Sequence, residues 1–290
     1  MNDAIVDSHV HLWRLADRPQ PWIDPATMAR IHRDFSVPDL HETIARLPVE
    51  RVVLVQVLNR EDETDDYLRI AAATPLVAGV VGWTDLAAAD VADRLDALCS
   101  RGTLLGIRHQ AQAEPDPAAW IRRPEVARGM RVLGARGLVC ELMMAAYQLD
   151  ATMDAVARGP DTVFVLNHAG KPPLAKGWTS EACRDWAASI TRLARLGNVV
   201  CKLSGLTTMA VLDSWTPADL MPAVDHLLGT FGPDRLLFGS DWPNSLRAGG
   251  YRRTLDAVLT CIGQLSTVER RAVLAANAER IYGLHEAATV

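Results

Sequence analysis

The stretch IVDSHVHLW, residues 5–13, combines an apolar, strand-like run with polar residues at alternate positions, Asp7, His9 and His11. Residues two apart in a β-strand share one face, so we expect the two imidazoles to point the same way. Two imidazoles at a strand end can hold a metal, polarise a substrate or form hydrogen bonds inside a core. The rest of the chain has to discriminate among these three interpretations.

Seven further short apolar runs follow, with helical segments between them. Most runs are too apolar to be half-exposed, which is typical of parallel strands covered by helices. Eight strand–helix repeats predict an α/β fold, a single (β/α)8 TIM barrel, with a doubly wound open sheet as the alternative. The predicted strands span residues 5–9, 52–57, 77–82, 104–109, 138–142, 163–168, 199–204 and 236–241. The predicted helices span 38–47, 64–73, 91–100, 124–136, 149–158, 180–196, 217–229, 251–263 and 267–282.

The composition indicates one globular enzyme-sized domain over residues 1–290, since no linker, repeat or low-complexity segment interrupts it. The formal net charge is -5 and no basic run exceeds two residues, which argues against nucleic acid or a membrane surface as partner. Five scattered cysteines without a C-x-x-C pair are typical of core thiols in a reducing compartment. We expect a cytoplasmic protein, a monomer or small homo-oligomer, in which residues 17–34 form part of a lid.

Polar residues gather where the predicted strands end, which favours the barrel because its strand ends converge on one rim. An open sheet would leave its outer strands too far apart for such a convergence. The residues in question are His9, His11, Arg108, His109, Glu141, Asn167, His168, Lys171, Lys202, Ser204, Ser240 and Asp241.

His9, His11, His168 and Asp241 make a plausible zinc site with room for a water on the metal. They also make a plausible metal-free site in which Asp241 is the base and the histidines orient and polarise. The alternative for Asp241 is a helix N-cap before Pro243. Glu141 could add a metal ligand or could be a buried acid paired with an arginine.

Other side chains near the rim have an expected role in substrate binding. Arg108 and His109 can clamp a carbonyl or an oxyanion, although Arg108 could instead form a structural ion pair. Lys171 and Lys202 could bind substrate or be exposed loop charges. We expect Gln112 and Asn167 to form hydrogen bonds to substrate hydroxyls. Trp13, Trp83 and Trp242 could stack on a sugar-like ring or could plug the barrel mouth. The remaining histidines, His32, His41, His226 and His285, are expected at the surface or in packing.

These residues stand within motifs that run along nearly the whole chain: DSHVHLW, VVLVQ, VAGVVGWTDL, LLGIRHQAQAEPDPAAW, FVLNHAGKPP, VVCKLSGL, PDRLLFGSDWP and NAERIYGL. The set resembles the amidohydrolase superfamily, and more narrowly its sugar-lactonase branch with L-fuconolactonases and L-rhamnonolactonases. The resemblance implies a TIM barrel with a hydrolytic water near the strand ends and a core site of His9, His11, His168 and Asp241.

The chain departs from the binuclear members of that superfamily, which carry a bridging lysine and two later histidines. Glu141 and Lys202 occupy strands where such ligands lie, and only one later histidine appears. The resemblance therefore implies one divalent metal, with zinc as first choice, or none.

The expected reaction is hydrolysis of a small-molecule aldonolactone to its sugar acid. Asp241 would accept a proton from the attacking water, and Arg108 with His109 would stabilise charge on the carbonyl oxygen. One alternative is a lactonase of aromatic catabolism that acts on pyrone or muconolactone carboxylates. Such substrates need cationic contacts, which Arg108, Lys171 and Lys202 could supply. Others are a metal-dependent decarboxylase of the same superfamily and a catalytically inactive barrel that only binds ligand.

Overall fold

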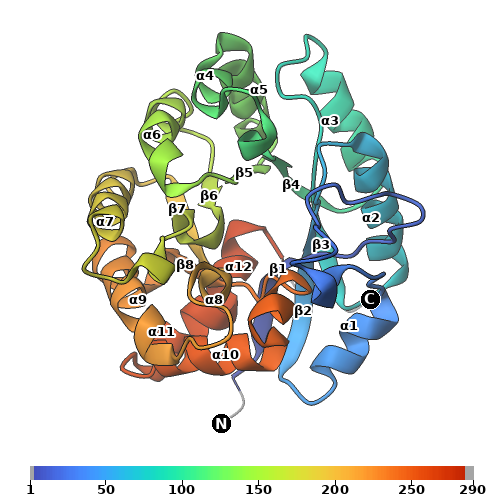
Figure 1. Ribbon diagram of the computed structural model, residues 1–290. Coiled ribbons are helices and arrows are strands. Elements are labelled where there is room, and N and C mark those ends of the chain that lie inside the picture. Colours follow the sequence, from blue (N-terminus) through green and yellow to red (C-terminus); the bar gives the residue numbers. More distant parts are fainter. Residues whose placement is uncertain (1–2, 285–290) are drawn as a thin grey trace.

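Eight parallel strands alternate with helices in the computed structural model, which describes residues 3–284 (Figure 1). Each strand pairs with the next along the chain, in the order β1 to β8, so the predicted (β/α)8 barrel is confirmed. The strands are β1 (Ile5–Val10), β2 (Val49–Val55), β3 (Val77–Gly82), β4 (Leu104–His109), β5 (Val139–Leu142), β6 (Phe164–Leu166), β7 (Val199–Leu203) and β8 (Leu236–Phe238).

The barrel closes between its first and last strands through backbone hydrogen bonds just beyond β8. Val10 and Trp242 form a parallel bridge, the amide of His11 donates to the Trp242 carbonyl (2.8 Å), and the amide of Asp241 donates to the His9 carbonyl (3.0 Å). This closure excludes the open-sheet alternative. It also places the segment after β8 beside the two histidines of the first motif.

All nine predicted helices have a counterpart. The predicted helix over 267–282 is divided into α11, a π-helical turn (Ala272–Ala276) and α12, and two short helices, α4 and α8, were not predicted. The helices are α1 (Val37–Ile44), α2 (Glu61–Ala73), α3 (Val91–Cys99), α4 (Pro117–Arg122), α5 (Pro124–Gly134), α6 (Leu149–Ala157), α7 (Glu181–Leu193), α8 (Leu206–Met209), α9 (Pro217–Phe231), α10 (Gly250–Cys261), α11 (Thr267–Arg271) and α12 (Asn277–Ile281). No helix within residues 3–284 is both long enough and apolar enough to cross a membrane.

The barrel interior holds an apolar layer that includes Val139, Val165 and Val200, against which Ala278 and Tyr282 pack from the C-terminal helical segment. Successive side chains of a strand alternate between its two faces. Glu141, Asn167 and Lys202 follow these three valines by two residues and therefore point into the same interior, one layer nearer the carboxyl ends of the strands. The barrel interior therefore contains a layer of polar side chains above its apolar layer.

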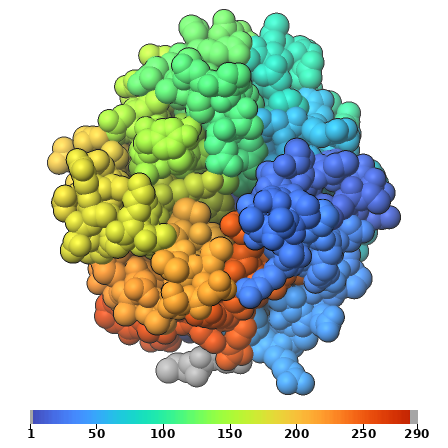
Figure 2. Space-filling view, in the orientation of Figure 1, coloured from blue at the N-terminus to red at the C-terminus, as the bar shows by residue number. Residues whose placement is uncertain are grey.

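The long segment between β1 and α1 crosses the carboxyl-end face of the barrel, as expected for a lid. Arg18 of this segment pairs with Asp62 and Asp66 of α2, and the Arg30 guanidinium donates to the Arg247 carbonyl (3.4 Å). In the space-filling view the blue N-terminal segment flanks a hollow, opposite the yellow and orange segments of the second half of the chain (Figure 2). His285 lies outside the described residues.

Candidate active site

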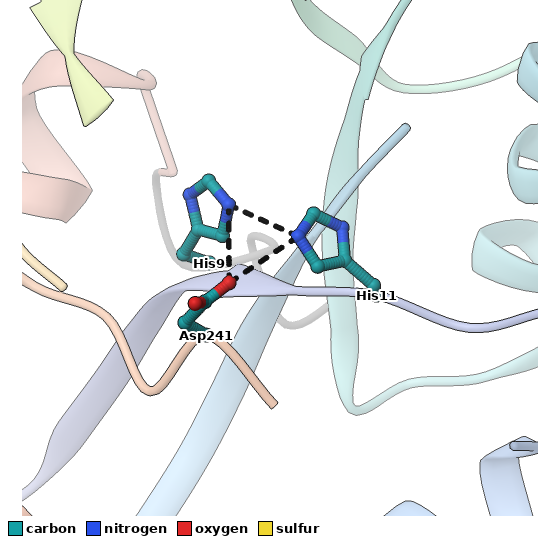
Figure 3. A group of neighbouring side chains, drawn as sticks. All are labelled: His9, His11 and Asp241. Carbon is teal, nitrogen blue, oxygen red and sulfur yellow. Dashed lines mark hydrogen bonds and ion pairs between the residues drawn. The ribbon is translucent and has the colours of Figure 1, made fainter. Parts of the chain in front are cut away.

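His9 and His11 turn their imidazoles toward one another at the carboxyl end of β1 (Figure 3). Their Nε2 atoms lie 3.2 Å apart, and Nδ1 of His11 lies 2.6 Å from the carbonyl oxygen of Val55. A carbonyl oxygen only accepts, so Nδ1 of His11 carries its proton and Nε2 keeps a free electron pair. Both rings are buried, and burial lowers the pKa of each, which favours neutral imidazoles.

The carboxylate of Asp241 faces these imidazoles from the other side of the barrel seam (Figure 3). Its Oδ1 lies 3.5 Å from Nε2 of His11 and 4.0 Å from Nε2 of both His9 and His168. Its Oδ2 accepts a hydrogen bond from the Asn244 side chain (2.7 Å). The helical turn that follows, Asn244–Ala248, begins after Pro243 and has no side-chain cap, so the carboxylate is not a helix cap. Burial would raise the pKa of Asp241, but His168, His11 and Asn244 lower it to about 2.

His168 reaches the same cluster from a turn in the left-handed region directly after β6. Residues 168–171 have φ values of 51°, 51°, 66° and 55°, and only the third is a glycine. Such backbone is sparsely populated and gathers at functional sites. Ser204 holds the imidazole in place, since its Oγ lies 3.0 Å from Nδ1 and 3.2 Å from the His168 amide. Burial lowers the pKa of His168 to about 3.

A cavity of about 490 Å³ opens in front of this cluster, and Arg108, His11, His168 and Asp241 lie in its wall. The buried guanidinium of Arg108 has Nη1 3.2 Å from Nε2 of His9 and donates to Oδ1 of Asn167 (3.1 Å). Its other terminal nitrogen donates to the Gln56 carbonyl. A fixed, buried cation therefore stands beside the carboxylate, ready to meet charge on a bound carbonyl.

Glu141, Asn167 and Lys202 lie in a fully packed layer behind the cavity and do not line it. Lys202 donates to Glu141 (2.6 Å), and Glu141 also accepts from Asn167 (2.8 Å) and from the Tyr282 hydroxyl. Glu141 is therefore a buried acid whose partner is a lysine, not an arginine, and it stands outside the group of possible metal ligands. Burial lowers the pKa of Lys202 to about 8.

His109 points away from the cavity, although its neighbours Arg108 and Gln110 line it. The alternation of side chains along a strand explains the difference. The His109 ring stacks on Trp120 with centroids 3.8 Å apart, accepts a hydrogen bond from Trp83 (3.0 Å) and lies 2.8 Å from Glu114. The geometry gives His109 and Trp83 a packing role rather than contact with substrate.

Trp13 and Trp242 are also placed in packing rather than at the cavity wall. Trp242 is buried against Phe35, and the Trp13 ring donates to the Arg33 carbonyl (2.8 Å). The aromatic ring that does line the cavity is Trp22, which stands edge-on to Trp13. Trp22 belongs to the Pro- and Trp-rich lid. The unusual length of this segment was the one sequence feature that could have pointed to a role for Trp22 at the site.

Gln112 and Lys171 both line the cavity, as predicted for substrate contacts, and they bond to each other across its mouth (2.6 Å). Burial lowers the pKa of Lys171 to about 8. Sequence reasoning missed further lining residues, some of which directly follow strands while others lie on loops, on α8 or on the 3-10 helix Asn244–Ala248. They are Asn59, Gln110, Met143, Thr208, Met209, Asn244, Arg247 and, from the lid, Pro21 and Met28.

The ligand atoms of His9, His11 and Asp241 lie within 4.8 Å of one another, the one such group found among residues 3–284. Two imidazole nitrogens and a carboxylate oxygen suit a divalent ion, and open positions would remain for water or substrate. His11 fits best, because a ligating histidine usually gives its other N–H to an acceptor such as the Val55 carbonyl. The donor set therefore fits one divalent metal.

Sequence and structure comparisons with known proteins point to the same family. Residues 6–284 match the model of a family described as Amidohydrolase. The chain is 38% identical to an L-fucono-1,5-lactonase of Burkholderia multivorans, with 98% of this chain and 97% of that protein aligned. An L-fucono-1,5-lactonase of Burkholderia ambifaria is 36% identical over 85% of this chain and 82% of its own length. A crystal structure of an amidohydrolase from B. multivorans with bound zinc superimposes with a TM-score of 0.91 at 37% identity, covering 97% of this chain and 100% of that chain.

Proposed function

This chain belongs to the amidohydrolase family, and from that premise we propose that it hydrolyses a sugar lactone to the open sugar acid. One observation supports this most directly. The Asp241 carboxylate, held ionised among three imidazoles, faces the same cavity as the Arg108 guanidinium. A base beside a fixed cation is the minimum that water attack on an ester carbonyl requires.

Asp241 takes a proton from the attacking water and returns it to the ring oxygen as the ester C–O bond breaks. Its depressed pKa keeps the carboxylate ionised at neutral pH, while the Asn244 side chain, which donates to its Oδ2, orients it. Arg108 stabilises the oxyanion that forms on the carbonyl, because its position is fixed by Asn167 and Gln56 before substrate arrives. A lactone has an alkoxide leaving group, so these groups suffice without covalent catalysis.

Zinc is the proposed ion for His9, His11 and Asp241, since two nitrogens and one oxygen are ligands that zinc accepts. A zinc ion bound there supplies a Lewis acid for the carbonyl and lowers the pKa of a coordinated water. The similar B. multivorans amidohydrolase with bound zinc supports this choice of metal.

L-Fucono-1,5-lactone or a closely related six-carbon or 6-deoxy aldonolactone is the proposed substrate. The cavity wall combines apolar side chains, among them Trp22 and Met143, with the amides of Asn59, Gln110 and Gln112. A polyhydroxylated ring with one apolar face uses both kinds of contact. Pyrone and muconolactone carboxylates and decarboxylation are not favoured, because the relatives at 36–38% identity are sugar lactonases.

A substrate panel tests the proposal. Purified enzyme is offered L-fucono-, L-rhamnono- and other aldonolactones, simple alkyl lactones and pyrone or muconolactone carboxylates, and acid release is followed with a pH indicator. We expect the highest kcat/KM on the 6-deoxy aldonolactones, with the other classes lower by orders of magnitude, because a bound analogue without hydroxyls would leave the amides of the cavity wall unpaired. Turnover of a pyrone or muconolactone carboxylate at a comparable rate would contradict the proposal. The Asp241→Asn protein, prepared identically, corrects for spontaneous lactone opening and for contaminating esterases.

A further inference from the structure

Asn244 lies between the Asp241 carboxylate and an arginine that the catalytic steps above do not involve. Its Nδ2 donates to Oδ2 of Asp241 (2.7 Å), and its Oδ1 accepts from Nη1 of Arg247 (3.3 Å). A guanidinium only donates and a carboxylate only accepts, so both neighbours require the same orientation of the amide. Exchange of the amide oxygen and nitrogen would break both hydrogen bonds. The amide of Asn244 therefore links Arg247 to the base.

The backbone brings Asn244 and Arg247 together. Both belong to the 3-10 turn after β8, and residues three apart in a 3-10 helix lie one above the other. The turn starts from the site itself, because the Ser245 amide donates to the Asp241 carbonyl (2.9 Å). The lid holds its other end, since the Arg30 guanidinium donates to the Arg247 carbonyl (3.4 Å). The backbone that carries Arg247 is thus fixed on two sides.

Packing alone does not account for the Arg247 side chain. Arg247 is half-buried and lies in the cavity wall, yet Asn244 is the one hydrogen-bond partner of its guanidinium within residues 3–284. Its Nε is buried without a partner in that part of the chain. By contrast, the half-buried Arg18 of the lid pairs with Asp62 and Asp66. Burial of a donor without a partner costs free energy, and a functional role explains why such a group is kept.

We propose that Arg247 is a positioning residue, which holds the Asp241 carboxylate in its catalytic orientation through the Asn244 amide. The inference rests on the proposed function, in which this carboxylate accepts the proton of the attacking water. The terminal torsions of Asn and Asp side chains have broad minima, so hydrogen bonds from outside have to fix them. With Oδ2 bound to Asn244, Oδ1 of Asp241 is the oxygen that faces Nε2 of His11 (3.5 Å). Without Arg247 the amide can rotate away, and the carboxylate turns with it.

A double-mutant cycle on kcat tests the route through Asn244, with the compound of the substrate panel that is hydrolysed fastest, whatever its class. Arg247→Met keeps the length of the side chain and removes its donors. We expect kcat to fall by about tenfold with KM nearly unchanged, because the base and not the substrate loses its support. In the Asn244→Ala background the same substitution should have no further effect. An equal fall in both backgrounds, or a higher KM with unchanged kcat, would contradict the proposal.

Arg247→Lys is the second variant and Arg128→Met the matched control. An ammonium can still donate to Oδ1 of Asn244, so Arg247→Lys should keep most of the wild-type kcat, and a loss as large as in Arg247→Met would contradict the proposal. Arg128 of α5 is also half-buried with a partnerless Nε, but it donates to the carbonyls of Ala87 and Ala88, outside the cavity. Arg128→Met should lower the melting temperature and leave kcat and KM unchanged. A tenfold loss of kcat there too would make the effect of Arg247 a general one of lost packing and overturn the inference.

The side-chain amide of Asn244 gives a readout that needs no turnover. Protein labelled with ¹⁵N-asparagine is examined by ¹H–¹⁵N correlation, and the Asn244 signals are those that disappear in Asn244→Ala. In wild type we expect one NH2 proton to be shifted downfield by the carboxylate, a shift that Arg247→Met loses and Arg128→Met keeps. Asn244 signals unchanged in Arg247→Met would overturn the proposal. This readout does not depend on lactone hydrolysis, so an inactive substrate panel would contradict the proposed function alone.

Discussion

Oδ1 of Asp241 lies 3.5 Å from Nε2 of His11, although one residue follows the first strand and the other follows the last. The contact depends on the barrel seam, where the Asp241 amide donates to the His9 carbonyl and the backbone of Asp241 adopts a φ of 55°. Closing the barrel therefore assembles the acid–base centre. The two histidines meet the carboxylate only when β1 and β8 come together.

Asp241→Asn should lower kcat for lactone hydrolysis by about a hundredfold or more while the protein stays folded, because the variant has no base to accept the water proton. The rate of acid release and the melting temperature are measured on the same preparation. Asp213→Asn is the control, since the Asp213 side chain is 88% exposed and its one ion pair within residues 3–284 is with Arg30, across 3.9 Å. Near-native rates, after mass spectrometry has excluded deamidation, would remove Asp241 from the mechanism.

Gly205→Ala should lower kcat markedly, whereas the free energy of unfolding should fall only a little. A Cβ at position 205 would lie 2.7 Å from Nδ1 of His168, so the imidazole must leave its present position in the site. The φ of +64° adds a strain of about 1 kcal/mol. Gly177→Ala is a matched control, because Gly177 also has positive φ (+82°) but a Cβ there meets no atom within 4 Å. Equal loss of activity in both variants would show that strain, and not displacement of His168, is responsible.

The fold could be predicted because two simple signals agree. The apolar runs have strand length and recur between helical segments, and the polar residues stand where each run ends, as a barrel with one functional rim requires. His9, His11, His168 and Asp241 were visible for the same reason. Each lies at or just beyond the end of a buried strand, where a side chain able to ionise has little packing purpose.

The rest of the site depends on directions that the sequence does not contain. A strand-end position can face the cavity, as Arg108 does, or the surrounding helices, as His109 does, and one step in register changes the outcome. Glu141 and Lys202 look like rim residues, but they lie within β5 and β7 and are buried one layer deeper. Trp22 could not be located, because its lid has no strand or helix periodicity.

Trp22→Ala should raise KM for the lactone by several-fold to about tenfold with little change in melting temperature, because the ring lines the cavity and is 36% exposed. Trp13→Ala should instead destabilise the protein by about 3–5 kcal/mol, since Trp13 is buried between Trp22 and Phe35. Steady-state kinetics and chemical denaturation separate the two effects. Trp178→Ala, on a partly exposed ring outside the cavity, is the control for KM. An unchanged KM in Trp22→Ala would remove Trp22 from substrate binding.

Glu63 should make the stability of the protein fall as pH rises toward neutrality. This carboxyl group on α2 accepts hydrogen bonds from the amides of Val57 and Leu58, while its Oε1 is buried without a partner in the described residues. Burial raises the pKa of Glu63 from 4.5 to about 7, although the two amides, Arg18 and Arg108 oppose the shift. Between these two values the unfolded chain has released a proton that the folded chain retains, so the free energy of unfolding decreases with pH and becomes level above about 7.

Glu63→Gln tests this directly, because the amide remains neutral at every pH and can still accept from the two backbone amides. Denaturant unfolding of wild type and variant is compared at pH 5.5 and pH 8, conditions chosen to lie on either side of the raised pKa. Relative to the variant, wild type should lose about 2 kcal/mol of unfolding free energy between the two conditions, since one pKa unit corresponds to about 1.4 kcal/mol. Glu42→Gln, on the exposed face of α1, should run parallel to wild type. A constant difference between Glu63→Gln and wild type at both pH values would mean that Glu63 is ionised throughout in the folded protein.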